Sequence, residues 1–114
     1  MNNLLKQLKA AAEETRLRIL AICAYAELTV TELTHILGQS QPRVSRHLKL
    51  LCDAGLLTRT REGSWVFYRR VENSEQRTNE LVVSILNRIP DNDPQFRRDM
   101  RRLAEVRKNR RAAA

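Results

Sequence analysis

A short helix followed almost at once by a second helix is the feature that most limits what this chain can form. Thr29-Val-Thr-Glu32 is a capping box: the Thr29 hydroxyl accepts from the backbone N–H of Glu32 while the Glu32 carboxylate reaches back to the N-cap. Gly38 suits the left-handed residue that ends many helices. The stretch therefore predicts a short helix whose inward face is formed by Leu33, Ile36 and Leu37.

The second helix is predicted directly after this stop. Ser40 is a favourable N-cap, and Pro42 lies in the first turn, where its missing N–H costs no hydrogen bond. The helix is expected over 41–54 and to end at Gly55, and its buried stripe is formed by Val44, Leu48 and Leu51. Two helices joined by a tight turn of this kind form a helix-turn-helix.

Beyond the second helix the pattern changes from helical to strand-like. Residues 56–61 and 65–71 are rich in Thr, Val and aromatic residues, and Glu62-Gly63-Ser64 between them is a turn signal. A two-stranded hairpin with basic residues on both arms is therefore predicted. Base stacking is one use for its aromatic residues, but their strand spacing favours packing in the core and in the hairpin for Trp65, Phe67 and Tyr68.

Apolar residues at helical spacing predict four further helices, over 3–12, from Glu13 onward, over 75–89 and over 95–111. In the helix that starts near Glu13, Arg16 and Arg18 fall on the side expected to be wetter. Its inward positions are expected to be Leu17, Leu20 and either Cys23 or Ala24. The fold class predicted from these segments is mainly α with a small β-hairpin.

The positive charge of the chain is concentrated in two blocks. The 114 residues contain 21 Lys and Arg against 13 Asp and Glu, a formal net charge of +8. Residues 38–70 hold seven basic and two acidic groups, residues 97–114 hold eight and two, and residues 71–96 are net acidic. Such an excess suggests a polyanionic partner. Because the first block coincides with the predicted helix-turn-helix and hairpin, double-stranded DNA is the expected partner.

Several classes of function are disfavoured by the composition. The length fits one small domain, and the longest apolar run, 19–26, is far too short to span a membrane. The N-terminal stretch does not resemble a secretory signal, and Cys23 and Cys52 form no CxxC pair, which together fit a reducing cytoplasm. The sequence offers no glycine-rich phosphate loop, nucleophile–base pair or paired carboxylates, so we expect neither an enzyme nor a cofactor.

The order of the elements predicts a winged helix-turn-helix. In this arrangement the N-terminal half of the second helix enters the major groove and the hairpin, or wing, contacts the adjacent backbone or minor groove. Arg pairs with guanine and Gln with adenine, each contact being worth about 1–3 kcal/mol of discrimination. His47 could instead be a rim residue packed on the hairpin. The residues expected to contact DNA are Ser40, Gln41, Arg43, Ser45, Arg46, His47, Lys49, Arg59, Arg61 and Arg69.

The runs ETRLRIL (14–20), LTVTEL (28–33), SQPRVSRHLKLLCDAGL (40–56) and REGSWVFYR (61–69) resemble the ArsR-type family of small dimeric bacterial transcriptional repressors. The resemblance implies a homodimer joined by the first and last helices of the domain, with one recognition helix on each half of an inverted-repeat operator. Alternatives are a winged-helix protein-interaction module and a thiol-based redox-sensing repressor. The expected interface residues are Leu4, Leu5, Leu8, Leu81, Val82, Ile85, Leu86 and Ile89.

The signal that such a repressor senses is a separate question. Many members of the family release DNA when a metal binds, most often through cysteines at positions that here are Thr29 and Thr31, whose hydroxyls are poor ligands for soft metals. Another family site needs histidines in the last helix, and residues 75–89 contain none. We therefore expect no metal site. Cys23 is expected in the core and Cys52 partly exposed, which leaves a thiol switch as the alternative.

The C-terminal segment has a resemblance of its own. Residues 93–107 are similar to the connector in bacterial proteins where this DNA-binding domain precedes an S-adenosylmethionine-dependent methyltransferase domain. That similarity implies a fused or associated methyltransferase, and the alternative is a basic extension that touches flanking DNA. The expected division is a DNA-binding and dimerisation domain over 1–90 and a basic helix or connector over 91–114.

Overall fold

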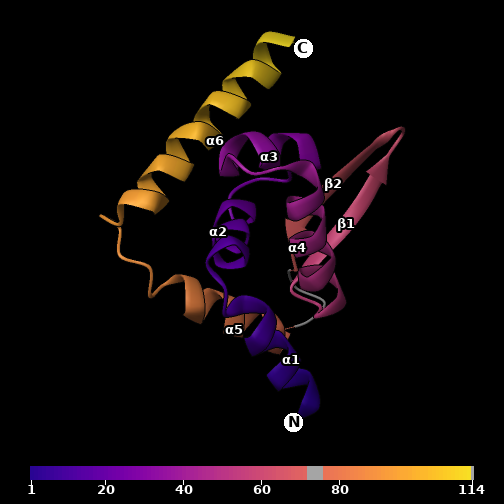
Figure 1. The fold of residues 1–114 in the computed structure, drawn as a ribbon, viewed down its shortest axis with the longest axis vertical. Coiled ribbons are helices and arrows are strands. Elements are labelled where there is room, and N and C mark those ends of the chain that lie inside the picture. The colour runs from indigo at the N-terminus through magenta and orange to yellow at the C-terminus, as the bar shows by residue number, and fades with distance from the viewer. Residues whose placement is uncertain (72–75, 114) are drawn as a thin grey trace.

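The computed structural model describes residues 1–71 and 76–113, which form a mainly helical fold with one antiparallel hairpin (Figure 1). This confirms the predicted fold class. The predicted helix 75–89 corresponds to an observed helix that ends at Leu86, while Glu75 lies outside the described residues. The elements are α1 (Asn2–Ala11), α2 (Glu14–Cys23), α3 (Val30–Leu37), α4 (Gln41–Asp53), β1 (Leu57–Glu62), β2 (Trp65–Arg70), α5 (Gln76–Leu86) and α6 (Pro94–Ala113).

The turn between α3 and α4 forms as the sequence predicts. Both capping-box bonds are present: Glu32 donates its backbone N–H to the Thr29 hydroxyl at 3.2 Å, and Thr29 donates its N–H to the Glu32 carboxylate at 2.9 Å. Gly38 then ends α3 in the left-handed conformation, at φ 68°. A side chain at that φ is strained, so glycine is the residue that lets the chain turn here without strain.

The core is built around α2, which packs against every other helix and against β2. Ile19, Leu20 and Ile22, which point in different directions from α2, are all fully buried, whereas Leu17, expected to be inward, is only half-buried. A one-sided stripe was therefore the wrong expectation, because a central helix is covered on nearly all sides. Each fully buried Leu or Ile side chain contributes about 1.5–3 kcal/mol relative to its exposed state.

The hairpin is anchored to the helices at its base. Leu57 of β1 lies opposite Arg70 of β2, and Glu62 lies opposite Trp65 at the tip. Tyr68 and Leu28 exchange backbone hydrogen bonds of 2.8 and 3.0 Å, which tie β2 to the segment before α3. The direction in which the hairpin projects is therefore set by the same segment that leads into the helix-turn-helix.

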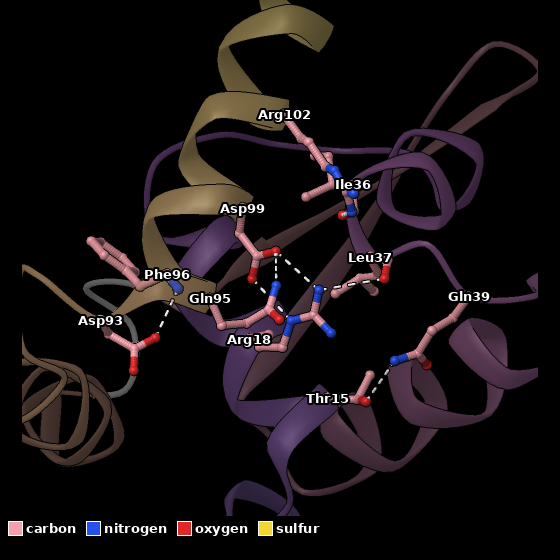
Figure 2. Close-up of polar contacts among 10 residues, drawn as sticks. All are labelled: Thr15, Arg18, Ile36, Leu37, Gln39, Asp93, Gln95, Phe96, Asp99 and Arg102. Carbon is pink, nitrogen blue, oxygen red and sulfur yellow. Dashed lines mark hydrogen bonds and ion pairs between the residues drawn. The ribbon is translucent and has the colours of Figure 1, made fainter.

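The long basic helix α6 folds back along α2 and α3 (Figure 1). Its Leu103 and Val106 join the core, and its Asp99, only 2% exposed, forms an ion pair with Arg18 of α2. The Arg18 guanidinium donates two hydrogen bonds of 2.9 Å to the two carboxylate oxygens of Asp99, and Gln95 donates a third (Figure 2). The expectation that Arg18 lies on a wetter side was wrong, because its partner is 81 residues away in the chain.

α6 also holds the end of α3, directly before the turn. The last carbonyls of a helix have no partner within it. Arg102 donates to the carbonyl of Ile36 at 2.9 Å, and Arg18 donates to that of Leu37 at 3.4 Å (Figure 2). The position of the helix-turn-helix is thus fixed partly by α6. No helix within the described residues is both long enough and apolar enough to cross a membrane.

Candidate nucleic-acid interface

The two sides of α4 differ sharply in character. Val44, Leu48 and Leu51 are fully buried and hold the helix to the core. The polar residues along its other side point outward, and those exposed between 41 and 49 are Gln41, Arg43, Ser45, Arg46 and Lys49. Because the buried stripe fixes the rotation of the helix, this outward face is presented as a rigid unit. It carries the side-chain types that pair with base edges in the major groove.

The start of α4 has no side-chain cap. Ser40 occupies the N-cap position, but its hydroxyl makes no hydrogen bond to the helix backbone, contrary to the expected role of this side chain as a cap. The first backbone N–H groups of a helix have no partner within it, and the helix dipole places partial positive charge there. The exposed Ser40 hydroxyl and these N–H groups together suit a phosphate oxygen.

His47 differs from its neighbours on α4, because it is turned toward the start of α2. Arg16 donates to its Nδ1 at 3.1 Å, and the Glu13 carboxylate lies 3.8 Å from the same atom. Burial, and then the nearby charges of Arg16, Arg43 and Arg46, lower the pKa of His47 against the opposing effect of Glu13. A neutral ring that accepts from a guanidinium fits this pKa. The partner of His47 is thus α2, and not the hairpin that was the expected alternative.

The hairpin presents different residues on its two faces. In an antiparallel pair, directly opposite residues lie on the same face, so the register places Arg59 and Arg61 on one face with Tyr68. The Arg59 guanidinium lies over the Tyr68 ring, 5.9 Å from its centroid. Arg69 lies on the other face and pairs with Glu27 at 3.5 Å. The structure therefore brings Arg59 and Arg61 together and separates Arg69 from them.

Trp65, expected in the core and the hairpin, belongs to the hairpin but not to the core. It lies at the tip, beside the turn at Gly63, and its side chain is 61% exposed. A large aromatic group held in water at the end of a wing is typical of a contact surface. Its position next to Glu62-Gly63-Ser64 could have predicted this exposure, since a residue beside the turn of a hairpin has little core to pack against.

A second exposed surface is apolar and lies at the opposite end of the molecule, where α1 and α5 meet (Figure 1). Gln7 of α1 donates to the Thr78 hydroxyl of α5 at 3.1 Å, so the two helices are in contact. Val82 is buried in the core of its own protomer. The other expected interface residues keep exposed area: Leu4, Leu5 and Leu8 are exposed, and partly buried positions are Leu81, Ile85, Leu86 and Ile89.

The outward face of α4, the tight turn before it and the basic hairpin beside it define a class: this is a winged helix-turn-helix DNA-binding domain. The model of the bacterial regulatory protein arsR family matches residues 13–59. The arsenic resistance transcriptional regulator ArsR1 of Pseudomonas putida is 39% identical over 99 residues, which cover 86% of this chain and 75% of that protein. The chain therefore belongs to the ArsR family of bacterial regulatory proteins.

Other comparisons agree with this assignment. The arsenical resistance operon repressor of Escherichia coli is 50% identical over 54% of this chain and 53% of its own length. Among solved structures, reduced HlyU from Vibrio cholerae matches 79% of this chain and 90% of its own, with a TM-score of 0.66 and 32% identity. The homodimeric winged helix-turn-helix domain of Mb0332 from Mycobacterium bovis has a TM-score of 0.66 and 26% identity, covering 74% and 75%. The protein is accordingly a DNA-binding transcriptional regulator of the repressor type.

The metal site common in the family does not fit the residues present. Thr29 is buried, and its hydroxyl already accepts a bond in the capping box, so it cannot turn outward without uncapping α3. Thr31 offers another hydroxyl, a hard ligand unsuited to soft thiophilic metals. In residues 1–71 and 76–113, no three His, Cys, Asp or Glu side chains gather where they could hold one ion.

The two cysteines also lack the features of a reactive pair. Both are free, Cys23 buried and Cys52 half-buried. Burial raises the pKa of Cys23 to about 12, and burial also raises the pKa of Cys52. Since the thiolate is the reactive form, neither thiol is activated in this fold.

Proposed function

We propose that two copies of this chain bind an inverted-repeat DNA operator, each with α4 in the major groove and its hairpin on the adjacent backbone or minor groove. The observation that carries the proposal is the outward face of α4, where the polar and basic residues of its first half stand exposed opposite a fully buried stripe. On this basis the protein represses transcription by occupying the operator, in the cytoplasm, where its DNA lies.

The side chains divide by the part of DNA that they would contact. Gln41, Arg43 and Arg46 would read base edges. Phosphate contacts would come from Ser40 with the N-terminus of α4, and from Ser45 and Lys49, although Lys49 also pairs with Asp53 at 3.0 Å. Arg59 and Arg61 would position the wing, and Trp65 joins them as a contact at its tip. Arg69 and His47 would act mainly through their protein partners, Glu27 and Arg16.

The homodimer is proposed from the apolar surface of α1 and α5. Three exposed leucines in one short helix, next to the partly buried residues of α5, form a patch that one protomer leaves in water. Patches of this kind mark protein interfaces. A two-fold axis through this surface would place the two copies of α4 on half-sites about one helical turn apart. The solved Mb0332 domain, described as homodimeric, supports a homodimer.

We propose that residues 1–90 form the DNA-binding and dimerisation domain and that 91–114 carry the basic helix docked on it. The Pseudomonas and Escherichia relatives are named as a regulator and a repressor, and neither as a methyltransferase. We therefore do not extend the proposal to a fused or associated methyltransferase. The signal of the arsenic-resistance relatives is likewise not carried over, because Thr29 and Thr31 do not suit a soft metal.

A paired substitution tests the assignment of α4. The wild-type protein first selects a duplex from a randomised pool, and binding to it is then compared with binding to a scrambled duplex. Arg43→Ala with Arg46→Ala is expected to lower the preference by about 1–3 kcal/mol for each base that is no longer read. Arg98→Ala with Arg101→Ala removes the same charge from exposed positions of α6 and serves as the control. A preference that survives the α4 change at moderate salt would exclude this role.

A further inference from the structure

The C-terminal end of α6 is joined to the wing. Arg110 lies over the ring of Phe67 in β2, 5.6 Å from its centroid. The same guanidinium pairs with Glu32 of α3 and donates to the carbonyl of Glu27 at 2.8 Å. Arg107 donates to the carbonyl of Tyr25. Most of these contacts hold the last turns of α6 against α3 and the segment before it, and the stacking of Arg110 on Phe67 brings this end of the helix to the hairpin.

The cations of α6 from Arg102 onward divide into two sets. Arg102, Arg107 and Arg110 are used within the protein, because they bind carbonyl groups of the domain. Lys108 and Arg111 beside them are exposed and form no ion pair with any described residue. Structural anchoring accounts for the first set and leaves the second without a partner among the residues that the structure describes. Two such cations on a helix whose end contacts the wing through Arg110 point to an anionic partner outside the chain.

The position of the C-terminal end of α6 in the molecule indicates which anion Lys108 and Arg111 would bind. The C-terminus of α6 and the tip of the hairpin lie at one end of the protomer, and α1 and α5 lie at the other (Figure 1). If α1 and α5 join two protomers, the α6 ends and the wings lie at the two outer ends of the dimer. DNA that continues past the operator runs toward these ends.

We propose that Lys108 and Arg111 bind backbone phosphates of the DNA that flanks the operator, beyond the segment contacted by the wing. The inference rests on the proposed function, since it needs α4 on the operator and the dimer joined through α1 and α5. The contact is to phosphate, so it adds affinity and a longer footprint but no base preference. α6 is thus both a clamp on the helix-turn-helix and an outer arm of the DNA-binding surface.

The test compares two charge-matched variants on two duplexes. Lys108→Gln with Arg111→Gln removes the proposed contacts. Arg98→Gln with Arg101→Gln removes the same charge, at the same spacing of three residues, about 15 Å away along the helix. Both pairs are exposed, so both variants should fold, which circular dichroism checks. The probes are the duplex selected by the wild type, trimmed to its half-sites, and the same site extended by about 10 base pairs, one helical turn, at each end.

On the extended duplex, the Lys108/Arg111 variant should bind about tenfold more weakly than the wild type at 0.1 M salt. The slope of log affinity against log salt should be about 2 smaller for each protomer that contacts its flank, since each phosphate that is neutralised contributes about 0.9. The Arg98/Arg101 variant should match the wild type on both duplexes, and all three proteins should bind the trimmed duplex alike.

Equal losses of affinity for both variants on the extended duplex would mean a general effect of charge and would overturn the proposal. So would a loss that is the same on trimmed and extended DNA, or unchanged binding throughout. Failure of the underlying function has a different signature: the wild type would then show no preference for any selected duplex over a scrambled one.

Discussion

Replacing Asp99 by asparagine is expected to destabilise the whole domain, although Asp99 lies in the basic C-terminal helix. The carboxylate is 2% exposed and binds an Arg18 side chain that is 15% exposed, through two bonds of 2.9 Å. The hydrogen bond to Asp99 raises the pKa of Arg18 further above its already high value, so the arginine stays charged at every practical pH. The substitution keeps the shape of the side chain and leaves this charge without its partner.

The size of the effect follows from the burial of the pair. Removing one partner of a buried ion pair costs about 3–5 kcal/mol, because the other charge remains desolvated. Arg18 keeps some contact with water and a bond to the Leu37 carbonyl, so about 2–4 kcal/mol is expected. That is a large fraction of the about 5–15 kcal/mol that stabilises a typical domain. The assay is urea unfolding followed by circular dichroism, at one fixed protein concentration because a dimer is involved.

Two further variants make this measurement decisive. Asp53→Asn breaks the exposed pair with Lys49 and should cost no more than about 0.5 kcal/mol. Arg18→Met with Asp99→Leu removes both charges and should be less destabilising than Asp99→Asn alone. Two results would contradict this reasoning: Asp99→Asn costing no more than Asp53→Asn, or the double variant being the least stable of the three. Either would mean that the Arg18–Asp99 ion pair does not contribute the expected amount, about 2–4 kcal/mol, to the free energy of unfolding.

Three other predictions concern the wing, pH and the thiols. Arg61→Ala should weaken binding to the selected duplex and reduce the salt slope by about 1 for each protomer, whereas Arg69→Ala should change the slope less, as gel-shift titrations across salt concentrations would show. Burial opposes ionisation of Glu32, but its bonds to Arg110 and Thr29 lower its pKa below 4.5 overall. The stabilising contribution of the Glu32 carboxylate is therefore complete above about pH 5 and is lost as the pH falls through the lowered pKa. Glu32→Gln should thus be less stable than the wild type at pH 7, and the difference should shrink below about pH 4. Urea unfolding at each pH measures this difference. Because burial raises the pKa of Cys23 to about 12, peroxide at neutral pH should leave this thiol unmodified, which mass spectrometry checks. The affinity for DNA should also be unchanged. A fall in affinity after peroxide treatment would support the thiol-switch alternative.

Local signals predicted the helix-turn-helix well. The capping box at Thr29 and the glycine at position 38 act within a few residues of chain, so neighbouring residues alone determine where α3 begins and ends. The buried stripe of α4 follows from helical spacing alone, and with it the set of residues that points outward. α4 and its outward face therefore follow from the sequence of this segment alone.

The surroundings that the sequence did not reveal depend mostly on residues far apart in the chain. The burial of Arg18 is set by Asp99 from another helix, and no pattern near Arg18 indicates that partner. His47 was assigned from its place on a basic helix, but its environment comes from Arg16, 31 residues earlier. The separation of Arg69 from Arg59 and Arg61 could be predicted from the sequence, because it follows from the hairpin register once the turn is placed at Gly63.

The central claim is that a two-fold homodimer reads two half-sites with two copies of α4, and the spacing of the half-sites tests it most directly. Inserting about five base pairs, half a helical turn, between the half-sites of the selected duplex rotates one of them to the opposite side of the DNA. The affinity should fall at least about hundredfold, because one protomer can no longer reach its bases. An affinity unchanged by the insertion would contradict the account.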